Sequence, residues 1–534
     1  MDKRSAVGVF VSVIIAFGSL VTAQDTAKEF VAGMNVERHL GPSEEHVYTI
    51  QLESGTAILA EADQEGLDLV IDIYGPDGQQ ISRLDTPNGA QGPELIDFTA
   101  LRSGSYKFVI HILDPNSKPG KYVMKVDRVL PPSENAKRLA KESLPARALY
   151  DLWEASLTDP QAVDRFMSNR KGKSPMLEAV PFNASEMRVT YICLGDRDTE
   201  RVVMYGGPDF GVVMRRLGKT NLFLGTQIVS NDARFEYSFA LREVHHAGPQ
   251  GEVEVAEALQ QGPWLLEMPN APPQPYILPR DAARKGSAAP LTITSTILKE
   301  DRKVTVYTPA GYDGRTPSNL LIVFDGVTYG GGQPDQAQVP TPTILDNLIV
   351  ENKIGPTIAV LVWTMGKRNR DLNGSEPFAD FIAGELVPWM RSHYNILPGP
   401  GSVVVAGSSS GGFAASYCAF HHPEAIGNVL SQSGAYWITK DWPSIRPPYP
   451  RDTGLMIEAF KSSPRLPIRF YLEVGRFDLG AALLGSNREL RDVLQAKGYE
   501  VDYREFDGGH DYAAWRGSLA DGLISLLGRK PAAP

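Results

Sequence analysis

The chain has 534 residues, too many for one hydrophobic core, so two to four domains are expected. It carries 53 basic and 63 acidic side chains, and this net charge of −10 argues against nucleic acid as a bulk partner. The apolar content of 42% is ordinary for a globular protein and excludes a largely disordered chain.

The first residues have the pattern of a secretory signal peptide. Two basic residues precede an apolar run from Ala6 to Leu20, and Val21 and Ala23 offer small side chains for cleavage. We therefore expect residues 1–23 to be removed and the mature protein to be periplasmic or secreted. An uncleaved anchor is the alternative, although the run is short for a membrane span. No later segment is long and apolar enough to cross a membrane.

Residues 25–130 consist of short alternating runs separated by turn residues. HVYTIQLESG alternates, and LDLVIDIYGPDGQQI contains a strand, a Pro-Asp-Gly turn and a returning strand. Strands at this spacing predict an antiparallel β-sandwich. The stretches AEADQEGLDLVIDIYGPDGQQI and ALRSGSYKFVIHI resemble the bacterial pre-peptidase C-terminal type of domain. Such a resemblance implies a small β module appended to an exported enzyme.

Three further segments lead to the last domain. Residues 131–173 start with two prolines and carry apolar residues at helical spacing, which predicts a helical connector. Strand patterns such as MRVTYICLGD and RFEYSFALRE return over 174–280 and predict a second β-sandwich. Residues 281–290, rich in Ala, Gly and Pro, indicate a linker.

From residue 291 to residue 534 the pattern changes to buried strands that alternate with helices. NLLIVFDGV and TIAVLVWTM are near-continuous apolar runs, as expected of strands covered on both faces. ADFIAGELVPWMRSHY and SNRELRDVLQAKG have helical periodicity. This alternation predicts an α/β domain with a doubly wound, mostly parallel sheet.

Three consecutive serines lie between the predicted strand VVVAG and the predicted helix GGFAASYCAFHH. This is the setting of a nucleophile elbow, G-x-S-x-G, in which a tight turn presents a reactive serine. Only Ser409 has glycine two positions before it, at Gly407, and two positions after it, at Gly411. A Gly/Ser linker is the alternative, but a linker would not join a buried strand to an apolar helix.

A nucleophilic serine needs a base and an acid that orients the base. In α/β-hydrolases the chain order is serine, acid, histidine. His510, in FDGGHDYAAWR, is the last histidine of the chain and follows a predicted strand. Asp478, just beyond the preceding strand, is the predicted acid. Glu473 within that strand and Asp511 beside the histidine are the alternatives.

The oxyanion hole needs two N–H groups that face the reacting carbonyl oxygen. We expect one from Ser410, which follows the nucleophile, and one from Gly326, in LLIVFDGVTYGGG. The carboxylate of Asp325 should point away from the site and hold its loop.

This chemistry requires no metal and no organic cofactor, and we expect none. Cys193 and Cys418 are the only cysteines and fall in different predicted domains. They should therefore be buried free thiols, without a disulfide framework.

Five segments together resemble the enterochelin (ferric-siderophore) esterases and the wider esterase D family of α/β-hydrolases. They are FDGVTYGG, RNRDLNGSEPFADFIAGELVPW, VVVAGSSSGGFAASYCAFHHPEAIGNVLSQSGAYW, EVGRFDLG and DGGHDYAAWRG. MRRLGKTNLFLGTQIVSNDARFEYSF looks like the N-terminal immunoglobulin-like domain of these enzymes. The fold class implied is a C-terminal α/β-hydrolase after two β-sandwich domains and a helical connector.

The resemblance implies serine hydrolysis of an ester, which in the siderophore branch is a catecholate trilactone or its iron complex. It matches the same triad and adds four residues near the substrate. Arg368 and Asp371 fall where the family has an Arg-x-x-acid pair at the substrate, and Trp515 and Arg516 match the pair after the histidine. A basic rim near the mouth of the site would suit an anionic ferric complex, with ordinary solvated loop charge as the alternative; its residues would be Lys367, Arg368, Arg370, Arg476 and Arg516.

Three functions remain open from the sequence. The first is an esterase for an enterobactin-like trilactone, and the second removes feruloyl or acetyl groups from polysaccharide. The third is a binding or scaffold protein with a decayed hydrolase domain. In the first two the partner is a small-molecule or polysaccharide-linked ester, with no nucleic acid and no membrane span after signal cleavage. The oligomeric state is not predicted.

Overall fold

The computed structural model describes residues 27–528 with short gaps. The gaps are 87–88, 145, 171–173, 197, 210, 248–251, 256–258, 282, 334–335, 441–452 and 480. The chain divides into two compact units, Met1–Asp159 and Pro160–Pro534. The predicted signal peptide, residues 1–23, lies outside the described residues. Within the described ranges, no helix combines the length and apolarity that a membrane span needs.

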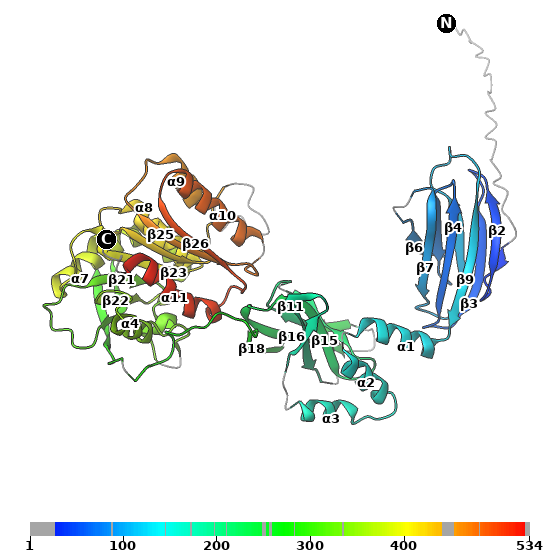
Figure 1. Ribbon diagram of the computed structural model, residues 1–534, viewed down its shortest axis with the longest axis horizontal. Coiled ribbons are helices and arrows are strands. Elements are labelled where there is room, and N and C mark those ends of the chain that lie inside the picture. Colours follow the sequence, from blue (N-terminus) through cyan, green and yellow to red (C-terminus); the bar gives the residue numbers. More distant parts are fainter. Residues whose placement is uncertain are drawn as a thin grey trace, which may run out of the picture. The chain divides into compact units, whose positions relative to one another are not determined.

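The first unit, blue in Figure 1, contains two antiparallel sheets that share one core. One sheet has the order β1 (Lys28–Glu29), β3 (His46–Leu52), β8 (Gly104–Ile112), β5 (Leu69–Tyr74), β6 (Gln80–Leu84), in which only the short β1 pairs in parallel. The other has the order β2 (Asn35–Leu40), β9 (Gly120–Leu130), β4 (Ala57–Glu65), β7 (Gln91–Thr99). Stacked rings of Phe30 and Tyr48, 4.7 Å between centroids, help to fill the core.

Helices occupy the residues expected to connect the domains. Helix α1 (Pro132–Ser143) begins with a proline, whose fixed φ and missing N–H suit the first helical turn. Helix α2 (Arg147–Ser156) follows in the same unit, whereas α3 (Ala162–Asn169) already belongs to the second unit. The segment predicted as one connector is thus divided between the two units.

After α3, the second unit continues with another pair of sheets, green in Figure 1. The first sheet has the order β10 (Met176–Val180), β11 (Asn183–Leu194), β15 (Leu222–Ser230), β14 (Arg215–Arg216). The second has the order β13 (Gly211–Val213), β12 (Thr199–Tyr205), β16 (Arg234–Ala247), β17 (Glu252–Val255), with β18 (Leu259–Glu267) also on β16. We call residues 176–267 the second β-sandwich.

The rest of the unit is built on an eight-stranded, mostly parallel sheet. Its order is β19 (Ser287–Ser295), β20 (Glu300–Thr308), β22 (Thr357–Val362), β21 (Asn319–Val323), β23 (Val403–Ser408), β24 (Asn428–Gln432), β25 (Arg469–Gly475), β26 (Glu500–Phe506). Strand β20 pairs in antiparallel fashion with both β19 and β22, and all other neighbouring strands of this sheet are parallel. Strand β19 begins at Ser287, inside the residues 281–290 that we expected to be a linker, because it pairs along its whole length with β20.

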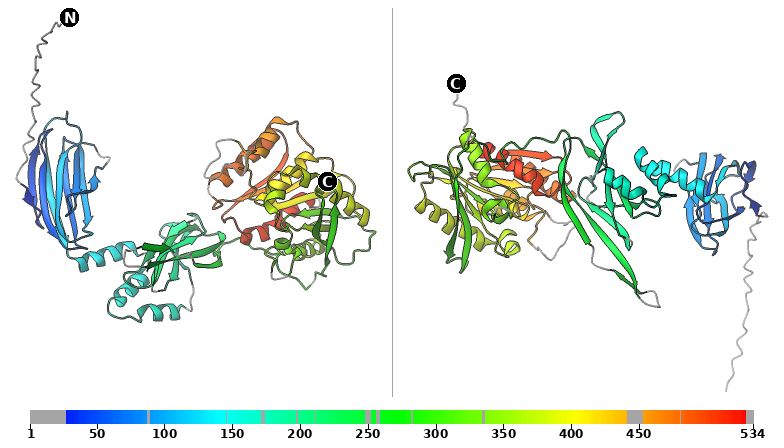
Figure 2. Two further views of the ribbon diagram at one scale, coloured as in Figure 1. Left: turned by 180° about the vertical axis from the view of Figure 1, so that it is seen from behind. Right: turned by 90° about the horizontal axis from the view of Figure 1, so that it is seen from below.

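Helices cover both faces of this sheet (Figure 2). Apolar residues of α4 (Thr341–Val350) and α11 (Tyr512–Leu527) form one core with the sheet. The opposite core is formed by α6 (Glu376–Asp380), α7 (Val387–His393), α8 (Ser410–His421), α9 (Leu455–Ser462) and α10 (Ala481–Ala496). Because the central strands are buried on both faces, polar chemistry is confined to the loops at their ends.

Candidate active site

Ser409 lies on the turn between β23 and α8, in a strained backbone conformation. Its φ of 56° and ψ of −123° fall in a region that residues other than glycine rarely adopt. The turn is so tight that a Cβ on Gly407 would lie 2.7 Å from the backbone of Gly411. At Gly411 a Cβ would meet only ordinary contacts, 3.5 Å away, so glycine is required sterically on the strand side. Ser409 itself is half-buried.

His510 and Asp478 lie in contact, on loops that follow neighbouring strands. His510 Nδ1 is 2.6 Å from Asp478 Oδ1. The Asp478 side chain is fully buried, and the His510 side chain is 20% exposed. The Asp478 loop follows β25 and the His510 loop follows β26, and these strands pair in parallel, so their ends meet at the same edge of the sheet as the elbow.

Glu473, one alternative acid, is engaged in a buried network inside the sheet. Its carboxyl accepts hydrogen bonds from Gln432 Nε2 at 2.9 Å, from the Tyr471 hydroxyl at 3.0 Å and from the Ser518 hydroxyl. Burial raises the pKa of Glu473 to about 7, against an ordinary value of 4.5. These contacts indicate a structural role under the elbow.

Asp511, the other alternative, points away from its neighbour's ring. One oxygen accepts the N–H of Ala513 at 3.0 Å and caps α11, and the other accepts the N–H of Glu236 at 3.1 Å. Burial raises the pKa of Asp511 to about 6. Of the three candidate acids, Asp478 is the one whose carboxylate contacts the imidazole.

One of the two expected oxyanion donors, Gly326, is contradicted by the structure. The N–H of Gly326 already donates to the carbonyl of Val362 at 2.8 Å, so it is not available to hold an oxyanion. The next amide, that of Val327, begins a short helical turn. Ser410 is the first residue of α8, where an N–H has no intrahelical acceptor. The sequence alone does not reveal which amide of FDGV pairs with the neighbouring strand, so it could not exclude Gly326.

Asp325 holds a basic side chain beside the elbow. Both its oxygens pair with Arg368, Nε to Oδ1 at 2.8 Å and Nη2 to Oδ2 at 2.9 Å. The carboxylate does not point away as we expected, since a Cβ on Gly411 would lie 3.5 Å from Asp325 Oδ2. The ion pair neutralises the charge that would otherwise oppose a developing oxyanion.

Comparison with known proteins supports an esterase. Residues 295–526 match the family model described as a putative esterase. Over this region the chain is similar to members of that family. Two curated relatives are the iron(III) enterobactin esterases of Dickeya dadantii, 30% identical over 47% of this chain and 56% of the relative, and of Escherichia coli K12, 30% identical over 49% and 62%. The chain thus spans about three fifths of the length of these relatives, and the matches support the enterochelin esterase family.

A solved structure extends the likeness beyond the esterase domain. It is the enterobactin esterase from Shigella flexneri in the presence of 2,3-dihydroxy-N-benzoyl-serine, 25% identical with a TM-score of 0.52. The alignment covers 67% of this chain and 97% of that one, a larger share than residues 295–526 alone. The similarity to this solved structure therefore includes the esterase domain and also residues outside 295–526.

Two residues expected at the substrate are buried within the esterase domain. Asp371 is 2% exposed and lies between Arg302, at 2.8 Å, and Arg370, at 2.7 Å. Trp515 is also 2% exposed, and its ring packs edge-on against His510 with centroids 4.9 Å apart. Both side chains are therefore more buried than we expected of residues at the substrate: Asp371 is enclosed by ion pairs, and Trp515 packs against the imidazole.

The expected basic rim is largely neutralised. Arg370 pairs with Glu300 at 2.7 Å, Lys367 contacts the same carboxylate, and Arg476 pairs with Asp507 at 2.9 Å. The Arg370 guanidinium in particular holds the pKa of Glu300 far below its usual range. Since most of these cations already have acidic partners, the rim carries little excess positive charge.

Arg516 is the exception among the basic residues of the rim. Its Nε donates to Gln274 Oε1 at 2.9 Å, so it binds the segment that leads into the esterase domain.

In the described part of the chain, no group of three or more His, Cys, Asp or Glu side chains could hold a metal ion. Cys193 and Cys418 are free and buried, as expected. Burial raises the pKa of both thiols, to about 12 for Cys193, so neither is a thiolate near neutral pH.

Proposed function

We propose that this chain is a serine esterase that cleaves carboxylic esters through an acyl-enzyme. The observation that carries the proposal is the contact between His510 and a buried Asp478 at the sheet edge that also holds a strained Ser409. A nucleophile on a strained elbow, a base and an acid that orients it are the parts that this chemistry needs.

In the proposed reaction, His510 Nε2 takes the proton of Ser409 as the serine oxygen attacks the ester carbonyl. The N–H groups of Val327 and Ser410 hold the negative oxygen, and Asp478 stabilises the imidazolium. His510 then returns the proton to the leaving alcohol, which leaves an acyl-serine. A water molecule, deprotonated by the same imidazole, releases the acid and restores the serine.

As substrate we propose a cyclic trilactone ester of the enterobactin type. The names of the similar proteins support this class, since curated relatives at 30% identity are iron(III) enterobactin esterases. Arg368, which is partly exposed beside the elbow, would border the substrate. We further propose that the enzyme is exported, periplasmic or secreted, on the pattern of residues 1–23.

One observation favours a second candidate, a feruloyl or acetyl ester of a polysaccharide. Most basic side chains of the rim are paired with carboxylates, which weakens the attraction for an anionic ferric complex. A site with little excess positive charge can also bind a neutral ester. A third possibility, a binding or scaffold protein with a decayed active site, lacks such support, because the triad residues are all present.

The deciding experiment compares the mature protein with its Ser409→Ala variant on three substrates. These are ferric enterobactin, iron-free enterobactin and methyl ferulate, with products separated by chromatography. Cleavage of enterobactin by the wild type only would support the trilactone esterase. Cleavage of methyl ferulate alone would move the enzyme to polysaccharide esters.

A fluorophosphonate probe separates an inactive site from an untested substrate. Labelling at Ser409 without turnover of any of the three esters would keep the esterase and reject both substrates. Neither labelling nor turnover, in a protein with an intact circular dichroism spectrum, would establish the non-catalytic alternative.

A further inference from the structure

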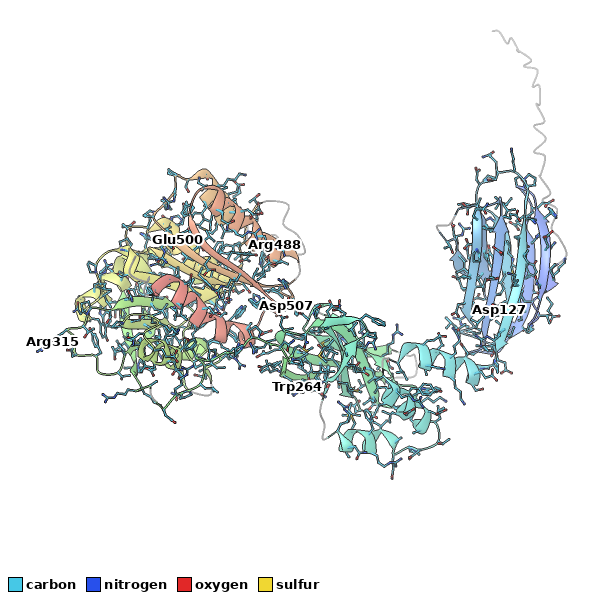
Figure 3. The ribbon with its side chains drawn as sticks, in the orientation of Figure 1. Asp127, Trp264, Arg315, Arg488, Glu500 and Asp507 are labelled. Carbon is cyan, nitrogen blue, oxygen red and sulfur yellow. The ribbon has the colours of Figure 1, made fainter. Side chains whose placement is uncertain are left out.

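Strand β16 of the second β-sandwich lies directly against the loop that carries His510. The N–H of Arg234 donates to the carbonyl of Asp507 at 2.9 Å, and the N–H of Glu236 donates to Asp511 Oδ2 at 3.1 Å. Two bonds from one strand thus bracket the histidine on both sides. Figure 3 labels Asp507 just beyond the end of β26, where the esterase domain meets the strands of the sandwich.

The approach of the strand to the loop is close. A Cβ on Gly508 would lie 2.6 Å from the carbonyl oxygen of Arg234, a distance at which one of the two backbones would have to move. A Cβ on Gly509 would lie 3.0 Å from Asp511 Oδ2. Glycine at these two positions of DGGHD therefore avoids steric clashes and allows the backbone of the histidine loop to approach β16 closely.

The acid loop is held by the same strand through an aromatic contact. Phe477, which directly precedes Asp478, packs against the core of the second β-sandwich. Its ring meets that of Phe235 edge-on, with centroids 5.8 Å apart and an angle of 86°. The N–H of Phe477 also donates to the carbonyl of Gly508 at 3.0 Å, which joins the acid loop to the histidine loop.

The contact surface reaches the imidazole itself. A cavity of about 250 Å³ lies between the two parts of the unit. Its lining includes Tyr205, Glu236 and Tyr237 from the sandwich, and Leu479 and His510 from the esterase domain. The sandwich therefore forms part of the surroundings of the base.

We infer that the second β-sandwich positions the catalytic acid and base: β16 and its Phe235 hold the loops of Asp478 and His510 in the geometry of a triad. Strand β16 ends at Ala247, outside the esterase match at residues 295–526. The positioning residues of this esterase would then lie partly outside the region that identifies it. The inference rests on the proposed esterase function.

The test is Phe477→Ala in the full chain, assayed on whichever ester the wild type cleaves. We expect kcat to fall by about 10- to 100-fold because a small displacement of the acid and base misaligns proton transfer. KM should change by less than about two-fold, since Phe477 does not touch the substrate in this scheme. Phe477→Leu, which keeps an apolar side chain in the sandwich core, should recover most of the loss.

A matched control separates positioning from simple loss of stability. Phe223 is buried in the same core but lies on β15, in the opposite sheet. Phe223→Ala should lower the melting temperature while kcat per active site stays at the wild-type value. Active sites are counted in each variant by stoichiometric labelling of Ser409 with a fluorophosphonate.

A second variant covers the case in which Phe477→Ala does not fold. Asp511→Asn keeps an oxygen to cap α11 but turns an amide nitrogen toward the N–H of Glu236, which breaks the tether. It should lower kcat per labelled site by about 10-fold or more.

The inference is overturned if both variants retain the wild-type kcat per labelled site. This includes the case in which total activity falls only because fewer molecules can be labelled at Ser409. An inactive, unlabelled wild type would instead reject the proposed function, so the two failures are distinguishable.

Discussion

Two buried aspartates at the same edge of the sheet have opposite surroundings. Asp478 follows β25 and is 0% exposed; Asp371, in α5 (Arg368–Leu372), follows β22 and is 2% exposed. Asp371 is enclosed by Arg302 and Arg370, whereas Asp478 meets the imidazole of His510.

The difference between the two sites lies in what the partner can do. A guanidinium keeps its positive charge over the accessible pH range, so Arg302 and Arg370 are fixed cationic partners of Asp371 that hold its loop in place. An imidazole can in general accept and return a proton, so a carboxylate in contact with one, as Asp478 is with His510, suits acid–base chemistry. The same residue type becomes structural in one loop and suited to catalysis in the next because of its neighbour.

The largest expected effect is that of Asp478→Asn on turnover. The amide would retain the shape of the side chain but lose the negative charge and favour the wrong tautomer of His510, so kcat should fall by about 10³- to 10⁴-fold. Steady-state kinetics on the cleaved ester measure this. Glu473→Gln serves as a matched control, since that carboxyl does not contact the histidine. Equal losses in the two variants would contradict the assignment of the acid.

Asp371→Asn should affect stability instead of turnover. It leaves the buried Arg302 with less compensation, which should cost about 3 kcal/mol of unfolding free energy. Denaturant unfolding measures the loss, and kcat per labelled site should stay near the wild-type value. Asp301→Asn, which alters an exposed carboxylate on β20, is the control and should cost less than about 0.5 kcal/mol. A strong rise in KM without loss of stability would return Asp371 to the substrate site.

Glu473 provides a third type of buried carboxyl, one with no charged partner. Because its pKa is raised from 4.5 to about 7 on folding, its protonated form stabilises the fold. That stabilisation is complete below about pH 4.5, decreases as the pH rises through the folded pKa, and amounts to about 3 kcal/mol in total.

The measurement compares unfolding free energies of the wild type and Glu473→Gln from pH 4.5 to pH 8. As the pH rises across this window, the free energy of unfolding of the wild type should fall relative to that of Glu473→Gln. Asp511, whose pKa is also raised, is present in both and cancels. A difference independent of pH would show that Glu473 has the same charge in both states.

The smallest effect is expected for Ser410→Ala, the neighbour of the nucleophile. Its proposed contribution is a backbone N–H, which alanine retains, so kcat should stay within about three-fold of the wild type. The same assay on Ser409→Ala gives the contrast between adjacent serines. A loss in Ser410→Ala as large as that in Ser409→Ala would mean that the wrong serine has been chosen.

Much of the architecture follows from local patterns. The alternation of apolar runs and amphipathic helices after residue 291 predicted a mostly parallel sheet with helices, and the structure contains one. The start of β19 at Ser287 escaped prediction because pairing with β20, not local propensity, makes those residues a strand. The context of Ser409, between a buried strand and an apolar helix, was also visible in the sequence.

The surroundings of the proposed triad could not be predicted, because they depend on contacts between segments that are distant in the chain. The resemblance placed Asp371 and Trp515 at the substrate, but both are buried by neighbours distant in the chain. Gly326 was expected to bind the oxyanion, but its N–H pairs with a strand more than thirty residues away.

By itself, then, the sequence determined most of the elements, the elbow and the residue types of the proposed triad, because these depend on periodicity and spacing along the chain. The tertiary structure decided which carboxylate meets His510, which cations are neutralised and which strand of another domain lies against the triad loops. Those outcomes depend on pairings between distant segments, and the energy of a charge or a proton is set by the groups that surround it in space.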